Sequence, residues 1–232
     1  YIVLDDMGFA QLGCYGSTIH TPNIDRLAKE GLRYNNFHTT AVCSATRTSL
    51  LTGANHHAAG CASLIEMRTG TENNMTGTIK PEYATIAEIL KEYGYATFCT
   101  GKWHLSAHQC ASDPVEGWPL QKGFDRYYGF LHGENDQYHP HLIRDNTRAP
   151  QPKTVEEGYH FSEDIVDNAI GYLFEHNMNS PEQPFFLYLA FGAMHTPHHA
   201  PKEYIDRYKG KFDEGWDVMR KRWFENQKKL GV

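Results

Sequence analysis

Short apolar runs alternate with amphipathic segments along the 232-residue chain. The run at 184–191 is continuous and bounded by proline and glycine, which predicts a strand buried on both faces. Residues 1–5 and 95–100 predict two more strands, and the first is already running at residue 1. Because these short strands alternate with helices, we expect an α/β fold around a largely parallel sheet.

Apolar residues at helical spacing predict the helices between and after the strands. Their expected ranges are 22–31, 43–52, 81–94, 161–176 and 220–231. Thr21 is the expected N-cap of the first helix, and Gly31 lies just past its end. In the fourth helix the spacing turns four side chains toward the core: Phe161, Ile165, Ile170 and Leu173.

Polar side chains follow each of the three predicted strands directly. Asp5 and Asp6 end the first, Lys102 and His104 follow the second, and His195 follows the third. In open α/β sheets, ligands bind beyond the carboxyl ends of the strands. We therefore expect these groups, which are far apart in sequence, to converge on one site.

Adjacent carboxylates at Asp5 and Asp6 repel each other unless a cation lies near them. A hard divalent ion with oxygen ligands satisfies this requirement. The alternative is a turn with one capping and one solvated acid.

Cys43 is expected at the N-terminus of a helix, with Arg47 one turn later on the same face. The positive end of the helix dipole and the guanidinium would then form an anion site beside a nucleophile. The alternative is a buried structural cysteine with a surface arginine.

Lys102 and His104 are two residues apart, so in an extended segment they face the same way. This pair suits an anionic ligand and proton transfer, although it could equally be a surface pair. His195 lies in "AMHTPHHAP", where two prolines argue against the helix that a metal-binding HxxHH pattern would need. We interpret it as a single functional histidine.

Composition narrows the classes of function. The formal net charge of −6 argues against a nucleic-acid partner, and no run is long and apolar enough to span a membrane. The five cysteines form no CxxC pair, which argues against a structural zinc site. Asn74 begins a possible glycosylation triplet.

Five segments resemble the signatures of the type I sulfatase family, and they occur in the expected order over residues 1 to about 212. They are "LDDMGF", "HTPNIDRLAKEGLRYNNFHTT", "CSATRTSLLTG", "GYATFCTGKWHL" and "PFFLYLAFGAMHTPHHAPKEY". The resemblance, strongest to bacterial arylsulfatases, implies an alkaline-phosphatase-like α/β fold and hydrolysis of aryl or carbohydrate sulfate esters. It also implies that residues 1–232 are the N-terminal part of a single catalytic domain.

The resemblance assigns Cys43 as the precursor of formylglycine, an aldehyde made by a dedicated maturation enzyme. Arg47 would hold the hydrated aldehyde. Asp5, Asp6 and the modified Cys43 would bind a divalent metal, usually calcium in this family. The family completes that metal site with a downstream Asp-Asn pair and adds a second lysine, which residues 1–232 do not contain, so we expect an incomplete calcium site.

The resemblance places Lys102, His104 and His195 around the sulfate ester. His195 would be the general acid for the leaving alcohol, and His104 would help release sulfate. The segment 129–145 is expected to form a loop over the site, in which His139 and His141 are candidates for substrate contact.

Three other functions stay open. Phosphonate monoester and phosphodiester hydrolases share this motif and fold. Ala45 replaces the commoner proline of the maturation motif, which leaves open an unmodified, non-catalytic binder of sulfated ligands. A cysteine hydrolase would use Cys43 with a histidine base.

Overall fold

The computed structural model describes residues 1–67, 75–110 and 112–232, so Asn74 lies outside the described residues. The chain divides into two compact units. Unit 1 comprises Tyr1–Asp6 and Thr40–His199, and unit 2 comprises Met7–Thr39 and Ala200–Val232.

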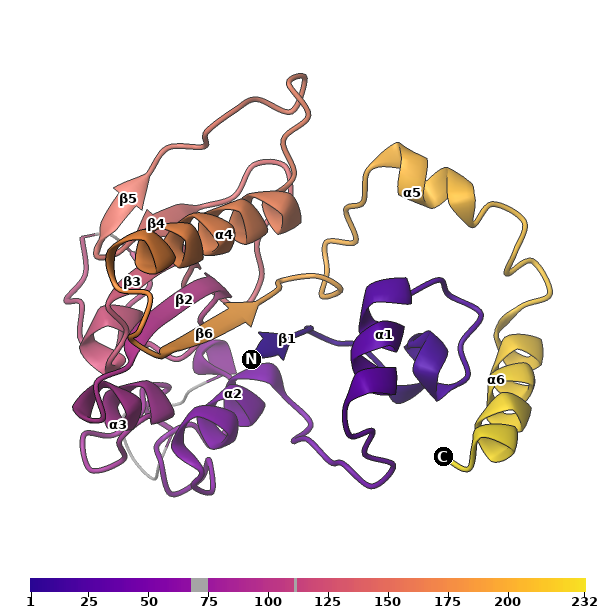
Figure 1. Ribbon diagram of the computed structural model, residues 1–232, viewed down its shortest axis with the longest axis horizontal. Helices are drawn as coiled ribbons and strands as arrows, with labels where there is room; N and C mark the ends of the chain where they lie inside the picture. Colours follow the sequence, from indigo (N-terminus) through magenta and orange to yellow (C-terminus); the bar gives the residue numbers. More distant parts are fainter. Residues whose placement is uncertain (68–74, 111) are drawn as a thin grey trace. The chain divides into compact units, whose positions relative to one another are not determined.

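In the described part of the chain, unit 1 is built on one sheet with the strand order β1-β6-β2-β3-β4-β5 (Figure 1). The strands are β1 (Ile2–Val3), β2 (Ala96–Lys102), β3 (Arg126–Phe130), β4 (Leu142–Arg144), β5 (Thr147–Ala149) and β6 (Phe185–Ala190). The first four in this order pair in parallel, and β4 and β5 join antiparallel. The largely parallel sheet expected from the sequence is confirmed, but β4 and the last two residues of β3 lie inside the segment 129–145 that we expected to be loop.

The central strand β2 is buried at all seven positions, because helices cover both faces of the sheet. Its side chains alternate between two cores: Cys99 packs on one side and Phe98 on the other. Gly101 has φ +101°, and a Cβ there would collide with the backbone of β6. Only glycine fits this position, so the tight contact between β2 and β6 depends on it.

Three helices of unit 1 cover the sheet: α2 (Cys43–Thr52), α3 (Ile86–Glu92) and α4 (Phe161–Asn179). Figure 1 shows α4 on one face and α2 and α3 on the other. Leu51 and Ala87 belong to the core on the α2 and α3 face, and Phe161 and Ile165 to the core under α4. Two 3₁₀ turns, η3 (Ile65–Met67) and η4 (Pro119–Lys122), lie in the connections.

Two details of the sequence prediction change. Helix α3 begins only at Ile86, because the Thr85 side chain accepts from the backbone N–H of Glu88 at 3.1 Å in a capping box. Ile170 is 59% exposed, so its predicted inward orientation is wrong. The buried stripe of α4 runs instead through Ala169 and Tyr172, which continue the helical spacing from Ile165.

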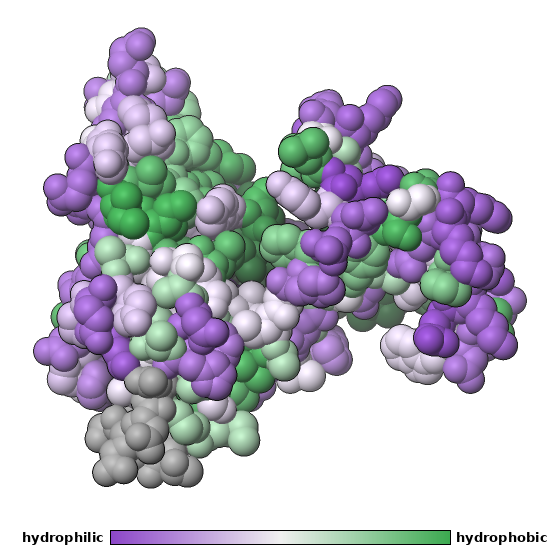
Figure 2. All heavy atoms as spheres, turned by 90° about the horizontal axis from the view of Figure 1, so that it is seen from below, coloured by the Kyte–Doolittle hydropathy of each residue, from purple (hydrophilic) through white to green (hydrophobic). Residues whose placement is uncertain are grey.

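Unit 2 contains the helices α1 (Pro22–Glu30), α5 (Lys202–Arg207) and α6 (Trp216–Leu230) and the 3₁₀ turns η1 (Phe9–Gln11) and η2 (Gly13–Tyr15). Asn226 of α6 donates to the carbonyl of Gly16 at 2.9 Å, and Trp223 donates to Thr18 Oγ1 at 3.2 Å. Figure 2 shows that hydrophilic residues dominate its visible surface. Among the described residues of the whole chain, no helix has the length and apolarity needed to cross a membrane.

Candidate active site

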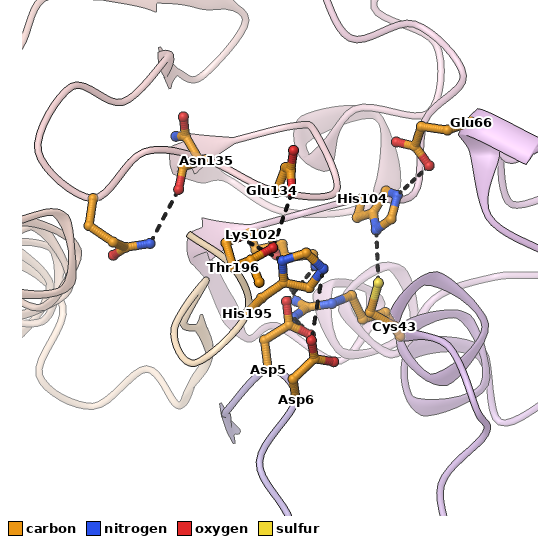
Figure 3. Close-up of polar contacts among 12 residues, drawn as sticks. Asp5, Asp6, Cys43, Glu66, Lys102, His104, Glu134, Asn135, His195 and Thr196 are labelled. Carbon is orange, nitrogen blue, oxygen red and sulfur yellow. Dashed lines mark hydrogen bonds and ion pairs between the residues drawn. The ribbon is translucent and has the colours of Figure 1, made fainter. Parts of the chain in front are cut away.

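The structure brings seven of the nine predicted site residues together at the carboxyl ends of β1, β2 and β6 and the N-terminus of α2. They are Asp5, Asp6, Cys43, Arg47, Lys102, His104 and His195. Figure 3 labels six of them, all but Arg47, and shows these six side chains gathered together although they come from four separate parts of the chain. The parallel sheet explains this convergence, because its strands end at the same edge.

A buried group of charges forms the floor of the site. Asp5 accepts a hydrogen bond from Lys102 Nζ, and its other oxygen lies 3.6 Å from Arg47 Nη2. Arg47 Nη1 donates to the Lys102 carbonyl at 2.9 Å and to the Tyr188 hydroxyl at 3.3 Å. All three charged side chains are nearly inaccessible to solvent. One carboxylate between two cations leaves a net positive charge, which favours an anion above it.

Arg47 stays charged in this buried position. Burial opposes its charge, but Tyr188 and Asp5 outweigh burial and raise the pKa of the guanidinium. In the described structure its Nε is buried without a hydrogen-bond partner. Arg47 lies one turn after Cys43, the first residue of α2, and the preceding Val42 offers no side-chain cap. Positive charge and uncapped N–H groups therefore meet beside Cys43.

Cys43, His104 and Glu66 form a hydrogen-bonded line. Cys43 Sγ lies 3.1 Å from His104 Nδ1, and His104 Nε2 lies 3.2 Å from Glu66 Oε2. A carboxylate only accepts hydrogen bonds, so Nε2 carries the proton and Nδ1 faces Cys43 as an acceptor. Burial first, and then the charge of Lys102, lower the pKa of His104 to about 4. The ring is therefore neutral near pH 7, and Nδ1 keeps its lone pair toward Cys43.

The backbone of His104 is held in an unusual conformation. It has φ +55°, a left-handed geometry that is uncommon for a residue other than glycine. Its N–H donates to the carbonyl of Leu131 at 3.1 Å, which continues the pairing of β2 with β3. Non-glycine residues in this region persist only where the surrounding contacts fix them, and such residues cluster at functional sites.

His195 lies across the site from His104. Its Nδ1 donates to the Thr196 carbonyl at 2.8 Å, which leaves Nε2 directed at Asp6 Oδ2, 3.8 Å away. The Thr196 hydroxyl in turn donates to Glu134 at 3.5 Å. This geometry directs one ring nitrogen into the site (Figure 3).

His139 and His141 lie apart from this cluster, in the loop between β3 and β4. The His139 side chain is 75% exposed and faces Asp136 at 3.8 Å. His141 is exposed, and its ring centre is 6.2 Å from that of His132. The structure gives neither residue a contact with the other seven.

Comparison with known proteins decides the family. The family model described as Sulfatase matches residues 1–228. The chain belongs to the sulfatase family. It is 35% identical to an uncharacterized sulfatase of Schizosaccharomyces pombe, over 100% of this chain and 44% of that protein. It is 29% identical to an arylsulfatase of Klebsiella aerogenes, over 100% of this chain and 50% of that protein.

Solved sulfatase structures share the fold. The crystal structure of Ps i-CgsB in complex with k-i-k-neocarrahexaose matches with a TM-score of 0.70 and 26% identity, over 99% of this chain and 54% of that chain. The alkaline-phosphatase-like α/β fold expected for a sulfatase is confirmed. The chain spans about half the length of the curated relatives that it matches.

The carboxylates of this sulfatase chain fit part of a divalent-cation site. Asp5 and Asp6 supply the hard oxygen ligands that calcium prefers, but calcium takes six to eight such ligands. In residues 1–67, 75–110 and 112–232 no cluster of three or more histidine, cysteine, aspartate or glutamate side chains has the arrangement to hold a metal. Asp5 is also already paired with Lys102.

Two partners of the site could not be found from the sequence. Tyr188 lies in the middle of β6, where the sequence pattern predicts a core side chain. Its hydroxyl nevertheless contacts Arg47. Glu66 is 38 residues from His104, and no local motif marks it. Both contacts arise only when distant segments meet.

Proposed function

We propose that the full-length protein hydrolyses sulfate esters of aryl or carbohydrate alcohols, with Cys43 converted to formylglycine by a maturation enzyme. The observation that carries this proposal is the position of Cys43. It lies at the N-terminus of α2, next to a buried cluster with net positive charge, and contacts a neutral histidine. Membership of the sulfatase family supports the same reaction.

Lys102 and Arg47 bind and orient the anionic group in this proposal. Both are buried and held in place, Lys102 by Asp5 and Arg47 by the Tyr188 hydroxyl. Fixed positive groups in a buried site stabilise charge that develops on transferring oxygens. Since the Arg47 Nε has no partner among the described residues, the cluster has an unused donor for an oxyanion.

The two histidines move protons on opposite sides of the reacting group. His104 Nδ1 takes a proton from the side chain at position 43, because Glu66 keeps the proton of the neutral ring on Nε2. In its doubly protonated form, His195 gives its Nε2 proton to the oxygen of the leaving alcohol and keeps its Nδ1 proton, which stays bonded to the Thr196 carbonyl. We further propose that His139 and His141 contact the alcohol part of larger substrates.

Two groups complete the chemistry of this proposal. Formylglycine supplies a hydrated aldehyde, with one hydroxyl as the nucleophile and a second that allows sulfate to be released. Asp5, Asp6 and the side chain at position 43 would hold a divalent cation, with further ligands from outside residues 1–232. The cation would supply positive charge beside the sulfate oxygens.

A thiol-based hydrolase is the second candidate, since the 3.1 Å contact between Cys43 Sγ and His104 Nδ1 is also the geometry of a cysteine nucleophile with its base. An aldehyde-reactive probe distinguishes the two, because it labels formylglycine and leaves a thiol unlabelled.

The test compares 4-nitrophenyl sulfate with phenyl phosphonate esters as substrates for the full-length protein purified from its native host. We expect turnover of the sulfate with a higher kcat/KM than any phosphonate. The Lys102→Met variant should lose about 100-fold or more in kcat/KM, whereas Lys29→Met on the exposed side of α1 should retain it. Faster turnover of the phosphonate, or full activity of Lys102→Met, would contradict the proposal.

A further inference from the structure

Glu66 is the only described side chain that hydrogen-bonds the outer nitrogen of His104. The Nε2–Oε2 distance is 3.2 Å, and the ring on the inner side of this bond is buried. Glu66 itself belongs to the 3₁₀ turn η3 and its side chain is 51% exposed. The hydrogen bond therefore links the buried His104 ring to a carboxylate at the protein surface.

The backbone of Gly133 packs against both the His104 ring and the Glu66 carboxylate. A Cβ added at Gly133 would lie 2.8 Å from His104 Cε1, 2.9 Å from Nε2 and 3.3 Å from Glu66 Oε1. The ring edge and the carboxylate thus pack against the same bare stretch of backbone. Together with the left-handed backbone of His104, this packing fixes the plane of the ring as well as its hydrogen bonds.

We infer that Glu66 is a positioning residue that holds His104 with its proton on Nε2 and its Nδ1 lone pair aimed at position 43. This inference rests on the proposed function of the site and adds to it a residue that acts through His104. Among the described residues, Glu66 hydrogen-bonds His104, and no hydrogen bond or ion pair joins it to Cys43.

The chemical reason lies in what can replace the carboxylate. Glutamate only accepts hydrogen bonds, so it permits one arrangement of the neutral ring. Water at the same place can donate or accept, and it permits both arrangements. When the proton lies on Nδ1, the ring has no acceptor toward position 43 and cannot take up a proton there. Removing Glu66 therefore lowers the fraction of molecules ready to react, without removing any group that binds the anion.

Kinetics of the matured full-length enzyme on 4-nitrophenyl sulfate give the first readout. Loss of the carboxylate behind a metal-ligating histidine typically lowers activity by about 10–100-fold, and we expect an effect of the same order on kcat in Glu66→Ala. KM should stay within about threefold, because Lys102 and Arg47 are intact. Glu66→Gln keeps an acceptor oxygen and should recover part of the loss. Glu82→Ala, which removes an exposed glutamate outside the site, should leave kcat unchanged.

Nuclear magnetic resonance of the unmodified protein gives the second readout, which does not depend on activity. In full-length protein with Cys43 as a thiol and ¹⁵N-labelled histidines, the buried Nε2–H of His104 bonded to Glu66 should give a downfield, slowly exchanging proton signal. The signal should vanish in His104→Ala, which assigns it, and in Glu66→Ala. It should persist in Glu66→Gln and Glu82→Ala.

Two outcomes would overturn the inference: unchanged kcat in Glu66→Ala, or a persistent Nε2–H signal in that variant. The second outcome overturns the inference even if kcat falls, since the loss would then come from a general disturbance of η3. If the wild-type protein shows no sulfatase activity but the signal depends on Glu66, the proposed reaction fails while the positioning role stands.

Discussion

The buried cluster of Asp5, Lys102 and Arg47 predicts that two single substitutions destabilise the protein by different amounts. Asp5→Asn removes the only negative charge and leaves two buried cations beside each other. Removing one partner of a buried ion pair costs about 3–5 kcal/mol, because the remaining charge is uncompensated. Lys102→Met keeps the volume and leaves Asp5 paired with Arg47. Its cost should be about 1–3 kcal/mol, the value of one buried oxygen left without its donor.

Thermal unfolding of the full-length protein measures both effects. The shift in Tm for a given loss of free energy falls as a domain grows, so the two variants are compared directly, and Asp5→Asn should lower Tm more than Lys102→Met. The measurement is made with a chelator present, so that loss of a bound cation does not add to the effect. If Lys102→Met lowers Tm as much as Asp5→Asn or more, the account of the cluster as a net-positive anion site is wrong.

Three further predictions concern the scaffold. Gly101→Ala should abolish soluble expression, because the new Cβ would collide with the backbone of β6. Gly171→Ala in α4 places its Cβ where no atom lies within 4 Å, so urea unfolding should show a gain in stability of about 0.5–1 kcal/mol. Although burial alone would raise it, the pKa of Asp125 lies below its usual value, because hydrogen bonds and the Lys91 ammonium outweigh burial. The stability from this carboxylate is present above about pH 4 and is lost as the pH falls through its lowered pKa, so Asp125→Asn should flatten the acid limb of stability against pH. Equal acid sensitivity of variant and wild type would contradict this.

The sequence identified the residues whose positions follow from local rules. Asp5 follows β1 and Lys102 ends β2 of a parallel sheet, and such strand ends share one edge, so their convergence could be predicted without a structure. Cys43 could be placed at a helix start from the pattern of its neighbours. Ile170 was misplaced because a helix of 19 residues offers several apolar stripes, and only packing against the sheet selects one of them.

The supporting partners could not be predicted in the same way. Glu66 meets His104 because η3 folds back toward the end of β2, and Gly133 meets both from the loop after β3. These contacts join segments dozens of residues apart, and the hydrophobic pattern of the sequence does not predict them. The strand β4 was also missed, since three residues next to polar turns carry too short a pattern to distinguish from loop.

The central claim is that Cys43 becomes the reactive aldehyde of a sulfatase site. The most direct test is the mass of the tryptic peptide that spans residues 34–47, taken from full-length protein purified from its native host. We predict the mass of the aldehyde or its hydrate at position 43. A peptide that carries only the unmodified thiol would contradict the claim and leave the thiol-based and binding-only functions to explain the site.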